Sequence, residues 1–249
     1  MDEEPLAGGN ASGAVVRVGG TVRKPWTDAT ESIADFVTFL RGKGVDVPEP
    51  LGRDGQGRQI IEFVPGDLAI DGGRLAADDL RRVGSMIRDI HDASEVYVPP
   101  SDAAWRTAIP APAAGLVCHN DLAPWNLVIG ERWVFIDWDA AAPSTRLWDL
   151  AYAAQAFTLS DSGREPALAA GDLAALVDGY GADERMRGEL PGAMAERTAA
   201  MLALLEGAAA TAEEPWASMH EDGHGAHWAR AVDYVREHQG VWARALSGR

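Results

Sequence analysis

The stretch that decides the fold reads CHNDLAPWNLVI at residues 118–129 and VFIDWD at residues 134–139 in one-letter code. Two apolar runs surround a polar loop and a turn at residues 130–132, a pattern that predicts a hairpin of short buried strands. The polar side chains then lie at the ends of these strands. Asp121, Asn126 and Asp137 are therefore expected to meet at one end of the hairpin.

The spacing of these three residues has a chemical reason. A proton acceptor and a metal ligand must face one reaction centre, and the short excursion from Asp121 to Asn126, stiffened by Pro124, lets one loop present both. In phosphoryl transfer, one carboxylate meets the attacking hydroxyl, while an amide oxygen and a second carboxylate hold Mg²⁺ against the nucleotide phosphates. The pattern predicts Asp121 as the catalytic base, with Asn126 and Asp137 as metal ligands.

Three motifs together carry a family resemblance. HxDxxxxN at residues 119–126, IDWD at residues 136–139 and LWDLA at residues 147–151 resemble the catalytic and metal loops of aminoglycoside and choline kinase-like phosphotransferases. Within that family, the wording is most similar to the bacterial branch that includes trifolitoxin-immunity-like proteins. The resemblance implies an α+β, protein-kinase-like fold of two lobes.

The resemblance also implies how the chain is divided. A reduced N-terminal β lobe over residues 1–66 would cover the nucleotide, and a mainly helical C-terminal lobe over residues 67–249 would carry the catalytic and substrate sites. Apolar periodicity after residue 172 predicts three helices, with a histidine-rich loop at residues 220–227 before the last of them.

A glycine-rich stretch precedes the first predicted hairpin. Residues 14–18 and 21–24 read as two strands around a Gly-Gly turn. A loop with few side chains lets backbone N–H groups approach phosphate oxygens, so the stretch is either a nucleotide-covering flap or a plain hairpin loop. The candidate phosphate-binding residues in it are Gly9, Asn10, Ser12 and Gly13.

Lys24 stands out because the chain contains only one other lysine, Lys43. We expect Lys24 to reach the nucleotide phosphates, the alternative being an exposed charge at a strand end. In the family, a helix glutamate pairs with this lysine. The helix predicted over residues 27–42 offers Glu31 and Asp35, but neither fits the family pattern, and both are expected to be solvated carboxylates.

Residues 59–64 predict a buried strand that ends at Pro65. The resemblance makes this strand end the hinge between the lobes, where Glu62, Phe63 and Val64 would contact adenine. Ordinary strand-end geometry accounts for the same residues.

Four further polar residues have predicted roles around the catalytic loop. His119 is grouped with the catalytic residues as a loop anchor, hydrogen-bonded to backbone without transferring the proton. Asp139 is a further metal-site acid, or only a loop acid. Asp149 is expected to cap the helix from residue 150 and to hold the catalytic loop. His91, near the end of the helix predicted over residues 76–93, is expected to pack or cap.

The composition narrows the class of partner. A net charge of −16 opposes binding to nucleic acid or to an anionic membrane, and it suits a cationic small molecule. The acidic N-terminus has no apolar signal region, and no apolar run is long enough to span a membrane, so we expect the cytoplasm. The single cysteine, Cys118, excludes an intrachain disulfide.

These features predict an ATP- and Mg²⁺-dependent kinase, with GTP as the alternative donor, that phosphorylates a hydroxyl of a small molecule such as an aminoglycoside, an amino alcohol or a sugar. One rival is a kinase-fold immunity protein that binds nucleotide and a toxin or antibiotic without catalysis. Another rival is a metal-dependent hydrolase built from Asp121, Asp137, Asp139 and His119.

Overall fold

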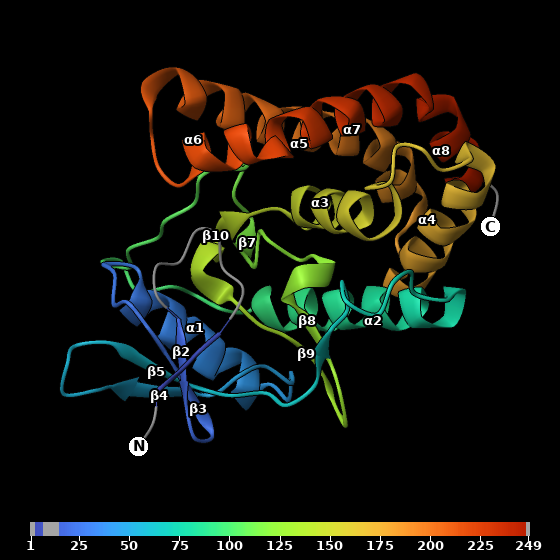
Figure 1. Cartoon of the computed structure of the whole chain (residues 1–249). Helices are drawn as coiled ribbons and strands as arrows, with labels where there is room; N and C mark the ends of the chain where they lie inside the picture. The colour runs from blue at the N-terminus through green and yellow to red at the C-terminus, as the bar shows by residue number, and fades with distance from the viewer. Residues whose placement is uncertain (1–2, 7–14, 248–249) are drawn as a thin grey trace.

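The computed structural model describes residues 3–6 and 15–247 (Figure 1). Its N-terminal part is an antiparallel sheet in the order β1-β2-β3-β5-β4 with one helix, α1 (Thr30–Gly42). The strands are β1 (Glu4–Pro5), β2 (Val16–Val18), β3 (Thr21–Lys24), β4 (Pro50–Arg53) and β5 (Gln59–Glu62). The predicted β2–β3 hairpin is confirmed. Strand β4 adds to this sheet by pairing with β5.

The C-terminal part is mainly helical and surrounds the central helix α3 (Figure 1). Its helices are α2 (Ala77–Ser94), α3 (Arg146–Thr158), α4 (Pro166–Tyr180), α5 (Glu184–Thr211), α6 (Trp216–Met219), α7 (Gly225–Glu237) and α8 (Gln239–Leu246). The predicted α+β class with a small β part and a helical part is confirmed. In the described part of the chain, no helix is long and apolar enough to cross a membrane.

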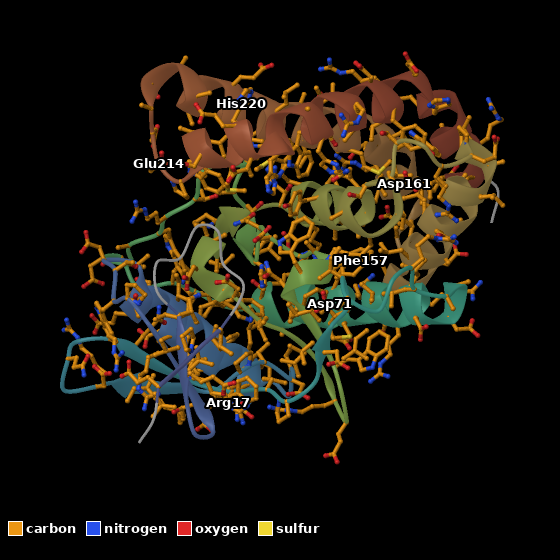
Figure 2. The ribbon with its side chains drawn as sticks, in the orientation of Figure 1. Arg17, Asp71, Phe157, Asp161, Glu214 and His220 are labelled. Carbon is orange, nitrogen blue, oxygen red and sulfur yellow. The ribbon has the colours of Figure 1, made fainter. Side chains whose placement is uncertain are left out.

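The C-terminal region departs from prediction at residues 220–227. Instead of a loop, a short π-helical turn, η3 (His220–His224), joins α6 to α7, with Gly223 at a positive φ of 102°. Figure 2 shows His220 and Glu214 at the outer end of this helical layer, on the opposite side of the molecule from Arg17 in the N-terminal sheet. Gly223 leaves the helical conformation, so the chain kinks here between α6 and α7, a bend that a glycine allows.

The hairpin predicted from residues 118–139 is present around the turn at residues 130–132, but the strand before the polar loop is not part of it. Strand β8 (Leu127–Ile129) pairs with β9 (Trp133–Phe135) and with β6 (Asp67–Leu68). Strand β7 (Leu116–Cys118) instead pairs with β10 (Ala142–Ser144), which follows the predicted metal loop. The polar loop at residues 119–126 is therefore held at its two ends by two separate small sheets.

Helices α2 and α4 approach closely because glycines face each other. A Cβ added to Gly84 would lie 2.1 Å from the carbonyl oxygen of Leu176, and one added to Gly179 would lie 2.0 Å from that of Arg81. These are backbone atoms, which cannot move aside as a flexible side chain can. The contact fixes α2, and with it His91 on the buried face of α2.

We predict that Gly84→Ala lowers the free energy of unfolding by about 1–3 kcal/mol, because the new methyl group must push two helix backbones apart. The matched control is Gly171→Ala in the same helix pair, where an added Cβ meets nothing within 4 Å. That substitution should leave stability unchanged or raise it by about 0.5–1 kcal/mol through helix propensity. Denaturant titration of both variants measures the difference, and equal stabilities would contradict the tight contact.

Candidate active site

The predicted catalytic loop and metal loop lie side by side and are joined by direct hydrogen bonds. Asn126, in the short 3-10 helix η1 (Pro124–Asn126), donates from Nδ2 to the backbone oxygen of Asp121 at 3.0 Å and to its Oδ2 at 2.8 Å. The backbone N–H of Ile136 donates to the backbone oxygen of Asn126 at 2.8 Å. The amide nitrogen of Asn126 thus faces Asp121, and its amide oxygen is left to accept or to bind a cation.

Two non-glycine residues in this region adopt left-handed backbone conformations. Asn120 has φ 63°, and Asp137 has φ 60° and ψ 65°. Asn and Asp tolerate this region best among residues with a side chain, and such strain persists where surrounding contacts over-determine it. Asp121 follows the first of these turns, and the charge of Asp137 in the second turn raises the pKa of Asp121, so the two carboxyl groups interact electrostatically.

The carboxyl group of Asp121 is removed from solvent and surrounded by polar and charged side chains. Burial raises its pKa to about 7, and the charge of Asp137 adds to this effect, while hydrogen bonds from Tyr152 and Asn126 and the charge of Arg197 oppose it. Burial also raises the pKa of Tyr152 well above the usual range, so the phenol is a donor. At neutral pH a substantial fraction of Asp121 is deprotonated and able to accept a proton.

Tyr152 and Arg197 are site residues that the sequence reasoning missed. The guanidinium carbon of Arg197 lies 4.2 Å from the ring centroid of Tyr152, and its Nη2 donates to the backbone oxygen of Asn120 at 3.4 Å. Arg197 is only 5% exposed. One signal was available: Arg197 interrupts the apolar face of α5 between Met194 and Met201, at helical spacing, where a buried charge needs a reason.

His119 binds backbone groups through both ring nitrogens. Nδ1 accepts from the backbone N–H of Asp121 at 3.2 Å, and Nε2 donates to the backbone oxygen of Ile136 at 3.0 Å. Burial lowers the pKa of His119, which keeps the ring neutral. The ring links the catalytic loop to the segment that leads into Asp137, the anchoring arrangement expected from the sequence.

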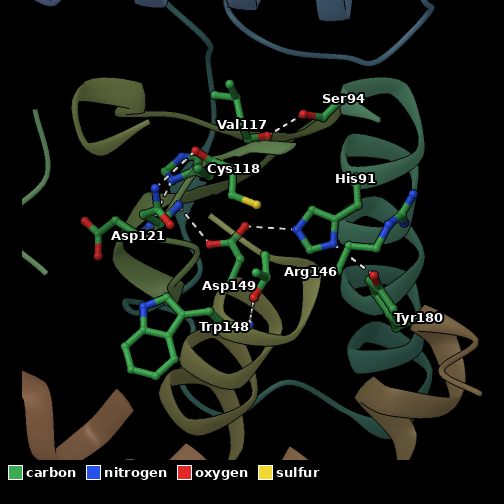
Figure 3. Close-up of polar contacts among 12 residues, drawn as sticks. His91, Ser94, Val117, Cys118, Asp121, Arg146, Trp148, Asp149 and Tyr180 are labelled. Atoms are coloured by element: carbon green, nitrogen blue, oxygen red, sulfur yellow. Dashed lines mark hydrogen bonds and ion pairs between the residues drawn. The ribbon is translucent and has the colours of Figure 1, made fainter. Parts of the chain in front are cut away.

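A buried network beneath the loop fixes Asn120 (Figure 3). Asp149 accepts the backbone N–H of Asn120 on Oδ1 at 2.8 Å, and its Oδ2 lies 3.0 Å from Nε2 of His91. The other nitrogen of His91 lies 2.9 Å from the hydroxyl of Tyr180. The predicted cap on α3 is wrong: Thr145 accepts from the N–H of Trp148 at 3.1 Å, so Thr145 is the cap.

Lys24 is buried and meets the metal loop. Its Nζ lies 2.5 Å from Oδ1 of Asp137 and 2.7 Å from Oδ2 of Asp139. Burial works against its charge, but the two carboxylates outweigh burial and raise the pKa of Lys24. Lys24 is therefore a charged, internal group rather than an exposed strand-end lysine. Within the described ranges, Glu31 and Asp35 make no ion pair, and both are exposed.

The other predicted nucleotide-binding residues lie in the glycine-rich stretch and at the end of β5. Gly9, Asn10, Ser12 and Gly13 lie outside the described residues. The N–H of Glu62 donates to the backbone oxygen of Glu49 at 2.9 Å, and that of Phe63 donates to the backbone oxygen of Gly20 at 3.0 Å. Both groups already serve the N-terminal sheet.

Val64 has a different environment. It packs with Val128 and Val134 in a small buried cluster, against which Leu68 and Ile136 also lie. This apolar patch adjoins Asp137 in the chain, at the place where β5 passes into the C-terminal part. The three valines are almost fully buried, so the cluster fixes the path of the chain after β5.

Comparison with known proteins agrees with the motifs. The family model described as the phosphotransferase enzyme family matches residues 101–190, which contain the catalytic loop, the metal loop and α3. The chain is 28% identical over 203 residues to the trifolitoxin immunity protein of Rhizobium leguminosarum bv. trifolii, covering 75% of this chain and 77% of that protein. The resemblance recognised from the sequence is confirmed.

Solved structures share the fold. The microcompartment-associated aminopropanol kinase superposes with a TM-score of 0.68 at 17% identity and covers 98% of this chain and 94% of its own. The amicoumacin kinase hAmiN, solved with AMP-PNP, Ca²⁺ and Ami, has a TM-score of 0.69 at 13% identity, with 94% and 88% covered. At these identities the likeness shows a kinase-like fold, as predicted.

The environment of Asp121 predicts a pH-dependent effect on stability. In the folded protein its pKa is about 7, against 3.8 for an ordinary aspartate, so between these values the folded state keeps a proton that the unfolded state releases. The contribution of Asp121 to stability therefore falls as pH rises through this window. Asp121→Asn should raise the melting temperature little at pH 4.5 and most at pH 8.

Calorimetric melting without nucleotide or divalent metal measures this difference, with the exposed Asp35→Asn as the matched control. A stability gain in Asp121→Asn that is the same at every pH would mean that Asp121 is not held in a desolvated environment.

Proposed function

We propose that this protein transfers the γ-phosphoryl group of ATP to a hydroxyl group of a small molecule in a Mg²⁺-dependent reaction, with GTP as the alternative donor. One observation carries the proposal: Lys24, from the distant strand β3, meets Asp137, while Asn126 binds Asp121 and the charge of Asp137 acts on Asp121. The match of residues 101–190 to the phosphotransferase enzyme family model supports the proposal.

The residues present fit a divalent cation. The amide oxygen of Asn126 and the carboxylate of Asp137 are the hard oxygen donors that Mg²⁺ prefers, and the nitrogen of Asn126 is already occupied by Asp121. We propose that Asn126 and Asp137 hold the ion. When bound, Mg²⁺ neutralises phosphate charge. In phosphoryl transfer most of the catalysis comes from positioning and charge neutralisation, so the protein needs no covalent intermediate.

The protein's own groups then have defined tasks. Asp121 orients the acceptor hydroxyl and accepts its proton, a task suited to a carboxyl group with a pKa of about 7. Lys24 contributes its positive charge to the phosphates. Glu62, Phe63 and Val64, at the end of β5, are the proposed contacts for the nucleotide base, and the buried cluster of Val64, Val128 and Val134 supports this strand end from below. Gly9 to Gly13 remain candidates for phosphate contacts.

Tyr152, which donates to Asp121, belongs to an aromatic cluster in which Tyr152 and Trp228 are buried and Trp125 is half-buried, and we propose that the acceptor binds on this side. The rings of Tyr152 and Trp228 stack with centroids 6.3 Å apart, and Trp125 packs edge-on to Tyr152 at 6.4 Å. Aromatic faces suit sugar rings and the cationic groups of amino alcohols or aminoglycosides, and the net charge of −16 favours cationic acceptors. We propose a cytoplasmic location, where ATP and Mg²⁺ are available, with neither nucleic acid nor membrane as partner.

A second candidate function rests on one observation, the 28% identity to a protein named for trifolitoxin immunity. In that case the fold would bind nucleotide and a toxin or antibiotic without phosphorylating it. A transfer screen with labelled ATP and GTP against a library of hydroxyl compounds separates the two functions. Phosphorylated product supports the kinase, and nucleotide binding without any product supports the immunity protein.

We predict that Asp121→Asn lowers turnover by roughly 10²-fold or more, because the positioned proton acceptor is lost while the shape of the side chain is kept. Affinity for MgATP should stay close to that of the wild type, which calorimetry measures on the same preparation. Asp161→Asn, an exposed loop substitution, is the control and should transfer phosphate normally. Wild-type turnover in Asp121→Asn would remove this residue from the reaction.

The metal assignment has its own prediction. Asp137→Asn should abolish the Mg²⁺-dependent part of ATP binding, since it removes the charge while Asn still accepts the left-handed backbone of this position. Isothermal titration with ATP, in Mg²⁺ and in EDTA, measures it. The control is Asp35→Asn on the exposed face of α1. If Asp137→Asn binds MgATP as the wild type does, the ion is held elsewhere.

A further inference from the structure

The ammonium group of Lys24 has two acid partners from the metal loop. Lys24 is 5% exposed, and its Nζ lies 2.5 Å from Asp137 and 2.7 Å from Asp139. A buried ammonium group needs a compensating charge, because water no longer solvates it. In the part of the chain that the structure describes, no carboxylate of α1 supplies that charge.

If the proposed function holds, Asp137 and Asp139 have different roles. Asp137 is assigned to the divalent cation, and a carboxylate shared with a doubly charged ion attracts a neighbouring ammonium group less strongly. The ammonium group of Lys24 would then lie close to the metal ion, while the carboxylate of Asp137 is bound to that ion. Asp139 is the second acid beside Lys24, and its side chain is 39% exposed.

The backbone that carries Asp139 adjoins a buried and well-packed aromatic residue, Trp138. Asp139 lies in the 3-10 helix η2 (Trp138–Ala140), next to Trp138, which is 5% exposed and donates from Nε1 to the backbone oxygen of Phe135 at 3.0 Å. The Trp138 ring packs against Phe36 of α1, with centroids 5.9 Å apart, and against His119 at 4.5 Å. Helix α1 thus supports the acid partner of Lys24 by apolar packing, without a carboxylate of its own.

We infer that Asp139 is the positioning residue for Lys24: it holds the ammonium group in place, directed at the phosphates, when the metal occupies Asp137. Asp139 acts through Lys24 and is not itself a ligand of the metal. This inference rests on the proposed function for its role in nucleotide binding, but the ion pair itself can be tested without nucleotide.

The first test is a double-mutant cycle on MgATP affinity with Asp139→Asn, Lys24→Gln and the double variant. We expect Asp139→Asn to weaken binding by about tenfold, and to have no further effect once Lys24 is Gln, because the acid acts only through the lysine. The Mg²⁺ concentration for half-maximal binding should not change. Asp139→Glu should restore affinity, and Glu31→Gln on α1 should have no effect.

Additive losses, with a raised Mg²⁺ requirement in Asp139→Asn, would overturn the inference and make Asp139 a metal ligand. Unchanged affinity in Asp139→Asn would overturn it as well, since Asp137 alone would then suffice.

The second test separates this inference from the proposed function. The same four proteins are unfolded with denaturant in EDTA, without nucleotide, and the coupling between residues 24 and 139 is read from the unfolding free energies. Coupling in this cycle supports the pair even if the wild type binds no MgATP, which would instead refute the proposed function. Independent, additive effects of the two substitutions would refute the pair.

Discussion

The backbone N–H of Asn120 and the buried carboxylate of Asp149 form the bond on which the site depends. Asn120 has a left-handed backbone conformation, which costs free energy, and the bond from Asp149 helps to hold it there. Asp149 is itself fully buried and bound by His91, whose other nitrogen faces Tyr180. Three helices, α2, α3 and α4, thereby orient one peptide group directly before Asp121.

A second set of polar contacts joins the N-terminal sheet to this scaffold. Lys24 on β3 reaches Asp137 and Asp139 across the boundary between the β part and the helical part of the chain. Arg132 in the turn after β8 also binds Glu62 at the end of β5 and, at 2.8 Å, Asp46. Charged contacts of this kind orient two parts of a protein while leaving them less firmly packed than an apolar core would. Such a junction suits the nucleotide binding that we propose for this site.

The local sequence motifs predicted the contacts within the catalytic loop better than they predicted the pairing of the strands. Spacing alone brought Asp121, Asn126 and Asp137 together, because a short loop and a hairpin leave few ways to arrange them. It also predicted that His119 would bind backbone and that Asp149 would hold the loop. Strand pairing was harder: β7 pairs with β10, and no feature of residues 116–118 distinguishes that partner from the neighbouring hairpin.

The sequence by itself determined which polar residues the loop presents, the α+β class and the family resemblance, because these depend on residue types and on their spacing along the chain. Only the tertiary structure decided which distant groups complete the site: Tyr152 and Arg197 around Asp121, and Asp139 as the second partner of Lys24. The physical reason is that burial and electrostatic pairing depend on distances across the folded chain. Lys24 and Asp139 are far apart in sequence, yet 2.7 Å separates their charged atoms.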